Sequence, residues 1–283
     1  MRSDTAKGTT LAAPATLYVG LLVAVPLLIL VAYSLSTQTY VEIDRTATLA
    51  NYREAFTDPL VRHLMIRSIW IAGAVTFVTV ALAYPIAYFI ALHARKKTLW
   101  LLLITIPFWS SYLLRVFAWK LILGFNGVLN SALMALGLID EPLTFLLYNE
   151  FAVVLTLAHA WAPFAILPIF VSIQKIDPAL LEAATDLGNS AFESFCRVTL
   201  PLTIPGIIAA CLIIFIPTVG DYVTPSLVGG SDGKMIANLI QVQFGAANNW
   251  PLGATLSLLA MLSVGFVAIL FVLGMNGVRR TIR

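Results

Sequence analysis

Residues 175–206 read KIDPALLEAATDLGNSAFESFCRVTLPLTIPG, which is the longest polar interruption in the second half of a strongly apolar chain. Asp177 followed by Pro178 is typical of a helix start, because aspartate caps free backbone N–H groups and proline needs no hydrogen bond at the first helical position. Gly188 stands where a helix would end in a left-handed residue. The pattern therefore predicts a short helix whose apolar face contains Leu180, Leu181, Ala184 and Leu187.

A second short helix is predicted after this glycine hinge. Ser190 and Glu193 have the spacing of a capping box, in which each residue satisfies a backbone N–H group near the other. Pro201 and Pro205 are predicted to end this helix, since proline lacks an N–H group and clashes with the preceding turn. A connection this structured indicates a docking surface, because connections in helical bundles are usually only a few residues long. An amphipathic helix lying in the lipid headgroups is the alternative.

The composition predicts an all-α integral membrane protein. The chain is 60% hydrophobic and 11% charged, with a mean hydropathy of +0.92, whereas soluble domains carry roughly 25% charged residues. We interpret the first apolar stretch as an uncleaved helix rather than a signal peptide, because it is too long for one. The stretches long enough to cross a hydrocarbon core of about 30 Å predict six transmembrane helices, at residues 14–36, 68–92, 98–123, 150–173, 204–227 and 252–274.

The distribution of basic residues predicts the orientation in the membrane. Basic clusters at residues 95–97 and 279–283 directly follow apolar spans, and such clusters favour the cytoplasmic side. Both termini and the loop at 175–206 are therefore predicted to lie in the cytoplasm of a bacterium, with the spans in its inner membrane. The net charge of +3 and the lack of a long basic run argue against nucleic acid as a partner.

Part of the polar loop resembles a known motif. The EAA motif, EAA-x3-G-x9-I-x-LP, marks the membrane subunits of binding-protein-dependent ABC importers. In that family the loop is the coupling helix, which sits in a groove of the ATPase subunit. The matching residues here are Glu182, Ala183, Ala184, Gly188, Leu200 and Pro201, with Val198 in place of isoleucine.

The resemblance implies the membrane domain of a type I ABC importer, which has a MetI-like fold. Residues 1–63 would hold the N-terminal tail, the first transmembrane helix and a periplasmic loop, residues 64–275 the core, and residues 276–283 a cytoplasmic tail. The first four motif residues, Glu182 to Ala184 and Gly188, would contact the ATPase. The implied partners are ABC ATPase subunits, a second related permease subunit and an extracytoplasmic solute-binding protein, besides membrane lipid.

The sequence carries no recognisable catalytic or cofactor site. Residues 229–235 resemble a phosphate-binding loop, but the spacing fails and Met235 replaces the hydroxyl that would hold magnesium. His63, His93 and His159 lie on different segments, so no metal cluster or hydrolytic constellation is predicted. We therefore expect no enzyme activity and no cofactor on this chain, with ATP and magnesium bound by the partner ATPase.

Polar and aromatic residues inside the spans indicate a path for a solute, because such residues are costly in a membrane. An acidic group surrounded by aromatic faces suits an organic cation, through charge pairing and cation–π contact. An internal ion pair of Asp221 with Arg115 or Lys120 is the alternative, with the aromatic residues marking the membrane interface. His159 is interpreted as a hydrogen-bonded contact between helices. The candidate path residues are Trp109, Tyr112, Trp161, Asp221 and Tyr222.

Two stretches give a narrower resemblance. Residues 107–115, PFWSSYLLR, and residues 220–230, GDYVTPSLVGG, are similar to the spermidine/putrescine permease subunits. That resemblance implies import of a polyamine by alternating access, although permeases for iron, phosphonates, opines or amino-acid-like solutes share pieces of these stretches. An ion-coupled secondary carrier is a further alternative, disfavoured because no internal repeat is evident and charges in the middle of the spans are scarce.

Overall fold

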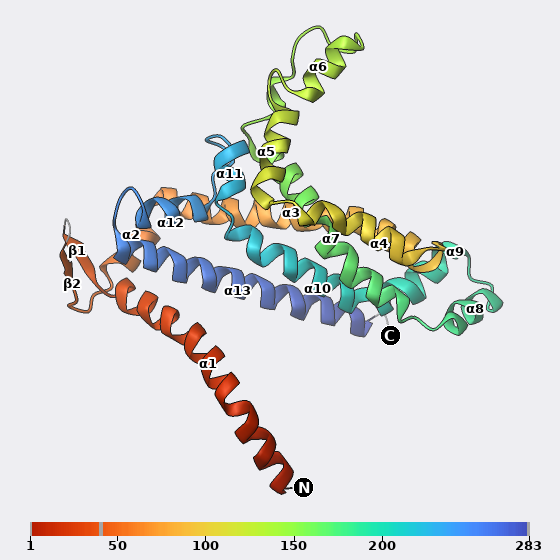
Figure 1. Ribbon diagram of the computed structural model, residues 1–283, viewed down its shortest axis with the longest axis horizontal. Coiled ribbons are helices and arrows are strands. Elements are labelled where there is room, and N and C mark those ends of the chain that lie inside the picture. Colours follow the sequence, from red (N-terminus) through yellow and green to blue (C-terminus); the bar gives the residue numbers. More distant parts are fainter. Residues whose placement is uncertain (1, 40–41, 282–283) are drawn as a thin grey trace. The chain divides into compact units, whose positions relative to one another are not determined.

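The computed structural model describes residues 2–39 and 42–281, and helices form nearly all of its regular structure (Figure 1). Within these residues, the segments long and apolar enough to cross a membrane number six, which confirms the predicted all-α membrane fold. The chain divides into two compact units, residues 1–62 with 239–261 and residues 63–238 with 262–283. The membrane segments are Ala12–Ser34, Pro59–Leu92, Tyr112–Ala135, Glu150–Gln174, Ala191–Val219 and Trp250–Met275.

The first unit is organised around the C-terminal end of its long helix. The Asn51 side-chain amide donates to the carbonyl oxygens of Ser34 at 3.1 Å and Ser36 at 2.7 Å, so it satisfies groups that the helix end leaves free. The Tyr33 ring lies 5.9 Å from the ring of Trp250. The elements that lie wholly in this unit are α1 (Arg2–Ser34), β1 (Thr37–Thr39), β2 (Glu42–Asp44) and α2 (Ala50–Thr57), with β1 and β2 antiparallel.

The apolar part of α1 has no cover within the described chain. None of the most hydrophobic window of Ala12–Ser34 is buried. Without water to drive apolar contacts, such a helix packs against lipid or against another protein in the membrane. The helix therefore offers a lateral surface along its whole apolar length.

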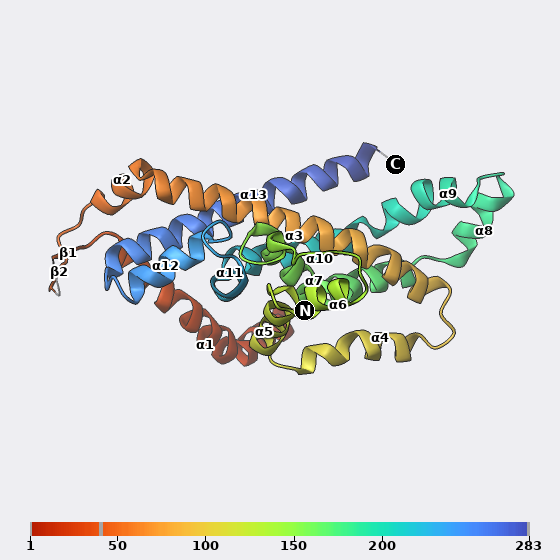
Figure 2. The same cartoon turned by 90° about the horizontal axis from the view of Figure 1, so that it is seen from above.

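The second unit contains the packed core of the chain. In it α7 and α10 lie side by side, and α8 and α9 lie beyond their ends (Figure 1, Figure 2). The remaining elements, of which α3, α12 and α13 cross the boundary between the units, are α3 (Pro59–Leu92), α4 (Lys97–Thr105), α5 (Tyr112–Leu123), α6 (Val128–Ala135), α7 (Glu150–Gln174), α8 (Pro178–Asp186), α9 (Ala191–Ser194), α10 (Leu200–Val219), α11 (Val223–Val228), α12 (Ile236–Phe244) and α13 (Trp250–Thr281), with short turns at Ile106–Trp109, Thr144–Leu146 and Phe195–Thr199.

A glycine allows the close approach of α7 and α10. A Cβ atom added to Gly206 would lie 2.5 Å from the Ser172 Cβ and 2.7 Å from the Pro168 carbonyl oxygen, both on α7. No larger residue fits there without moving one helix. Leu157 and Ile214, one on each helix, are fully buried, so the interior of this pair is apolar and densely packed.

A partly exposed ion pair and a buried hydrogen bond tie α3 to two other parts of the second unit. The Arg67 guanidinium Nε lies 3.3 Å from Glu150 Oε1 at the start of α7. The Ser68 hydroxyl accepts a hydrogen bond of 2.7 Å from the backbone N–H of Ile236 at the start of α12, and it donates to the Leu64 carbonyl at 2.7 Å. Ser68 is fully buried, so both bonds replace contacts with water.

The predicted continuous span at residues 98–123 is wrong, because the structure breaks it in the middle. After α4, a 3₁₀ turn at Ile106–Trp109 contains Pro107, and Ser110 and Ser111 are extended. The Ser110 hydroxyl donates to the Pro107 carbonyl oxygen at 2.6 Å and so satisfies a group that the interrupted helix leaves free. From this break α5 leaves α4 at a steep angle (Figure 1, Figure 2).

The prediction that Pro201 and Pro205 end a second short helix is also wrong. A π-helical turn, Phe195–Thr199, follows α9, and α10 continues from it through both prolines. In this turn the Leu200 N–H donates to the carbonyl of Phe195, five residues back. Such a widened turn admits a proline that would clash with an ordinary helical turn. The segment Ala191–Val219 is therefore one helical rod.

Replacing Ser68 with alanine tests the contact between α3 and α12. The Ser68→Ala variant leaves the Ile236 N–H buried without an acceptor, which should lower the free energy of unfolding by about 1–3 kcal/mol. Thermal unfolding of the purified protein in detergent measures the loss. Thr79→Val is the matched control, because among the described residues the Thr79 hydroxyl bonds only to the Val75 carbonyl of its own helix. Equal stability of the two variants would contradict the assignment.

Candidate functional site

A polar cluster forms where α10 ends and α11 begins. Gly220 caps α10, and the next residue, Asp221, is half-buried. One Asp221 carboxylate oxygen accepts the Tyr112 hydroxyl at 2.6 Å, and the other accepts the Val223 N–H at 2.9 Å. The Tyr112 hydroxyl also contacts the hydroxyl of Thr224, which is fully buried. The structure thus brings the two predicted residues Tyr112 and Asp221 together.

The predicted alternative for Asp221, an internal ion pair, is not formed in the described part of the chain. No nitrogen of Arg115 or Lys120 lies within 4.0 Å of its carboxylate there. The Arg115 guanidinium instead stacks 4.2 Å from the centre of the Phe108 ring. Its Nε and Nη1 atoms are buried and lack hydrogen-bond partners among the described residues. The carboxylate therefore remains available to a cation from elsewhere.

The other predicted path residues do not join this cluster. Trp109 is 92% exposed, on the turn between α4 and α5. Trp161 packs its ring 5.5 Å from Phe164, and its buried Nε1 atom has no partner among the described residues. Tyr222 is about half exposed and acts through its backbone, since its carbonyl accepts the Asn238 side chain at 2.9 Å. Tyr222 was predicted to join Asp221 because it is the next residue in the chain, but its aromatic ring is not part of the cluster.

His159 makes the predicted contact between helices. The Trp119 indole N–H on α5 donates to His159 Nδ1 on α7 at 3.1 Å. A nitrogen that accepts a hydrogen bond carries no proton, so His159 is neutral in this arrangement. This bond confirms the interpretation of His159 as a packing contact.

The loop at α8 has the predicted start and end. The Asp177 carboxylate accepts the Ala179 N–H at 3.0 Å and caps the helix. At the other end, Gly188 has a φ of 81°, its N–H donates to the Thr185 carbonyl at 2.9 Å, and the next N–H donates to the Ala184 carbonyl at 3.1 Å. This pair of bonds is a Schellman motif, which stops the helix at a fixed point.

The predicted capping box opens α9. The Glu193 carboxylate accepts the Ser190 N–H at 2.9 Å, and the Glu193 N–H donates to the Ser190 hydroxyl at 3.3 Å. Arg197 then donates to the Asn189 side chain at 2.8 Å, on the same side of Gly188 as α9. The loop is therefore held by side-chain bonds on both sides of Gly188.

This loop presents apolar side chains that nothing in the described chain covers. Leu187 is 84% exposed and Phe192 is 74% exposed. Glu182 and Ala183 are also exposed, whereas Ala184 is buried, so its methyl group faces the chain itself. Of the other motif residues, Gly188 is exposed, and Leu200 and Pro201 are half-buried at the start of α10.

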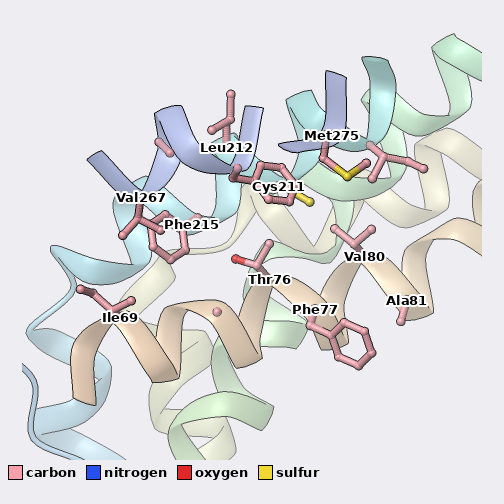
Figure 3. Close-up of a pocket in the computed structure, with 14 residues that line it drawn as sticks. Ile69, Thr76, Phe77, Val80, Ala81, Cys211, Leu212, Phe215, Val267 and Met275 are labelled. Atoms are coloured by element: carbon pink, nitrogen blue, oxygen red, sulfur yellow. The ribbon is translucent and has the colours of Figure 1, made fainter. Parts of the chain in front are cut away.

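The second unit contains a cavity and a groove whose lining residues do not include the Asp221 cluster. One, of about 460 Å³, lies between α3, α10 and α13 and is lined by apolar side chains such as Phe77, Phe215 and Val267, with Thr76 and Cys211 at its wall (Figure 3). It offers no charged group to a solute. The other, of about 660 Å³, is a groove between α7, α8 and α10 with a charged rim.

Sequence reasoning missed two contacts near the site, that of Thr224 with Tyr112 and Asp221 and that of Phe108 with Arg115. Thr224 lies three residues after Asp221, so a turn that caps α11 brings both toward the same place. Phe108 lies seven residues before Arg115, across the unforeseen break at Ser110 and Ser111. No residue pattern in a single sequence predicts this contact, because the contact depends on the angle between α4 and α5 at the break.

Known proteins are similar to this chain over most of its length. The spermidine/putrescine transport system permease protein PotB of Escherichia coli (strain K12) is 37% identical over 225 residues, which cover 79% of this chain and 81% of that protein. PotB of Haemophilus influenzae is 37% identical over 212 residues, covering 75% and 73%. The inner membrane ABC transporter permease protein YdcU of Escherichia coli (strain K12) is 34% identical over 231 residues, covering 77% and 72%.

Solved structures share the fold. A chain of a bacterial ABC transporter involved in the import of alginate aligns with a TM-score of 0.71 and 17% identity, covering 99% of this chain and 98% of that one. A chain of the MetNI methionine ABC transporter aligns with a TM-score of 0.54 and 15% identity, covering 80% and 100%.

The helices that cross the membrane, the capped loop between α7 and α10, and these likenesses point to one family. The family described as binding-protein-dependent transport system inner membrane component matches residues 5–282. This chain belongs to that family of inner membrane components of binding-protein-dependent transport systems.

Proposed function

We propose that this chain is a permease subunit of an ATP-driven importer, and that it forms the translocation path for a polyamine by alternating access. The observation that carries the role in ATP-driven transport is the capped loop of α8 and α9. It combines a fixed backbone with uncovered apolar side chains, Leu187 and Phe192, outside the membrane-spanning part of α7. A surface that is both rigid and apolar suits a stable protein partner.

The polyamine is proposed from two lines of support. The relatives that carry the name of a spermidine/putrescine permease are 37% identical to this chain over about three quarters of it. The Asp221 carboxylate, with the Tyr112 hydroxyl beside it, supplies the anionic and aromatic groups that an alkylammonium needs. An amine entering the path would replace or join the Tyr112 hydroxyl as a donor to this carboxylate.

The proposed machine includes further proteins. ABC ATPase subunits bind ATP and magnesium and receive the α8–α9 loop, so this chain needs no nucleotide site or cofactor of its own. A second related permease subunit completes the path, and an extracytoplasmic solute-binding protein delivers the solute. A structure of the alginate transporter, which has the same fold, was determined in complex with a ligand-bound periplasmic protein.

We place both termini and the α8–α9 loop in the cytoplasm. The basic residues at 95–97 follow α3 directly, and this position favours the cytoplasmic side of a bacterial inner membrane. An even number of crossings then puts the α8–α9 loop on the same side, where an ATPase can reach it.

Stimulation of ATP hydrolysis tests the proposal as a whole. The complex that accompanies the tagged chain is purified from native membranes, and ATPase activity is measured with its solute-binding protein and spermidine, putrescine or a non-cationic solute. We expect stimulation by the polyamines alone. Stimulation by another solute would keep the ATP-driven importer and replace the polyamine. An ion-coupled carrier would instead show no associated ATPase and uptake that stops when the ion gradient collapses.

Substitution of Gly188 tests the docking role of the loop. Gly188→Val forces a branched side chain into the left-handed region, at a cost of roughly 1–2 kcal/mol, and should shift α9 relative to α8. The variant should insert normally, retain little solute-stimulated ATPase activity and support little uptake. Gly188→Asn is the control, because asparagine adopts this conformation readily. Normal coupling in the valine variant would argue against a role for the hinge.

Substitution of Asp221 tests the amine site. Asp221→Asn removes the charge but keeps the shape, so uptake at limiting polyamine should fall roughly tenfold to a hundredfold, as expected when a charged hydrogen bond is lost. Asp232→Asn, in an exposed turn after α11, should leave uptake unchanged. Uptake by membrane vesicles, normalised to inserted protein, is the measurement. Wild-type uptake by Asp221→Asn would remove this residue from the path.

A further inference from the structure

The groove between α7, α8 and α10 has an apolar floor and a charged rim. Its floor lies along the membrane segment that ends at Gln174, with Leu167, Val171 and Leu202 among its lining residues. Lys175 and Asp177, just past that end, lie at its rim and are exposed. At 1.5 Å per residue, Leu167 lies about 12 Å from Lys175 along α7, so the groove reaches well into the hydrocarbon region.

The two charges at the rim have no ion-pair partner within the described chain. Lys175 and Asp177 form no ion pair there, with each other or with another residue. Asp177 uses only one carboxylate oxygen, Oδ1, to cap α8 through the Ala179 N–H. Lys175 follows the last turn of α7, where the helix dipole favours a positive charge. One cation and one anion therefore stand unpaired above an apolar groove.

We infer that this groove binds a phosphatidylethanolamine molecule from the leaflet on the α8 side of the membrane. An acyl chain fills the apolar floor, the phosphate pairs with Lys175, and the ammonium donates to the free oxygen of Asp177. The headgroup carries the complementary pair of charges, and the end of the apolar segment puts that pair at headgroup depth. Phosphatidylcholine has the same phosphate, but its quaternary ammonium cannot donate a hydrogen bond to Asp177.

The position of the groove links this lipid to the loop. Leu180, on the first turns of α8, lines the groove together with residues of α7 and α10. A bound lipid would therefore touch α8 directly. The binding itself does not rest on the proposed transport function, because it follows from the shape and charges of the second unit alone.

Photo-crosslinking tests the inference. The complex purified with its partner subunits is placed in nanodiscs that contain phosphatidylethanolamine or phosphatidylcholine with a photoreactive acyl chain. Cross-linked peptides are then mapped by mass spectrometry. We expect phosphatidylethanolamine to label peptides that contain residues 167–180 and 202–209 several-fold more than phosphatidylcholine does.

The variants separate the headgroup contacts from the acyl chain. Lys175→Gln should lower labelling by both lipids by up to about fivefold, the effect of losing one exposed ion pair with the phosphate. Asp177→Asn should remove the preference for phosphatidylethanolamine, and asparagine still caps α8. Ala209→Trp fills the groove and should abolish labelling by both lipids. Lys234→Gln, at an exposed lysine between α11 and α12, is the control and should change nothing.

Three results would overturn the inference. In the first, the two lipids label the peptides equally, and neither Lys175→Gln nor Asp177→Asn changes that labelling. A second is the absence of cross-links in the two groove peptides. The third is a cross-link pattern in which these peptides are shielded by the second membrane subunit, since the groove would then be a protein interface.

Discussion

A backbone N–H or C=O group without a hydrogen-bond partner costs several kcal/mol inside hydrocarbon, and this constraint governs where the helices of this chain are interrupted. Each interruption carries its own replacement partners. At the break in the third apolar stretch, the Ser110 hydroxyl donates a hydrogen bond to the Pro107 carbonyl oxygen. Asp221 accepts backbone N–H groups of α11 just beyond the end of α10. The irregular places are therefore also the polar places, and they are where a solute can find a charged or hydrogen-bonding group.

The capped loop shows how far local chemistry can be predicted. The Asp177 cap, the left-handed Gly188 and the Ser190–Glu193 box each depend on a few neighbouring residues, and all are present in the structure. The end of the second helix depends on more than its neighbours. Proline usually breaks an ordinary helix, but the π-helical turn lies just upstream of Pro201, and α10 continues through Pro205 as well. Such a turn has no recognised residue pattern, so the sequence alone favoured a break.

Contacts between distant segments were harder to predict, as the Asp221 cluster illustrates. The cost of a carboxylate in a membrane singled out Asp221, and the need for aromatic groups beside an acid singled out Tyr112. The structure brings these two side chains together, and their role in the path stays a proposal. Trp109 was included as an aromatic residue of the same span, yet it is almost fully exposed, on the turn where that span is broken. Composition predicted the number of membrane segments, whereas the grouping of residues 239–261 with the N-terminal unit is a matter of tertiary packing.

The π-helical turn has a mechanical consequence. Because it joins α9 to α10 without a break, residues Ala191–Val219 form a single lever arm of 29 residues, about 43 Å long at 1.5 Å per residue. A tilt of about 5° at one end of such an arm displaces the other end by about 4 Å. The far end is Gly220, next to Asp221. A tilt imposed on α9 on one side of the membrane can thus reach the polar cluster as a displacement longer than a hydrogen bond, and Pro205 and Pro217 inside α10 are the positions where the helix can bend instead.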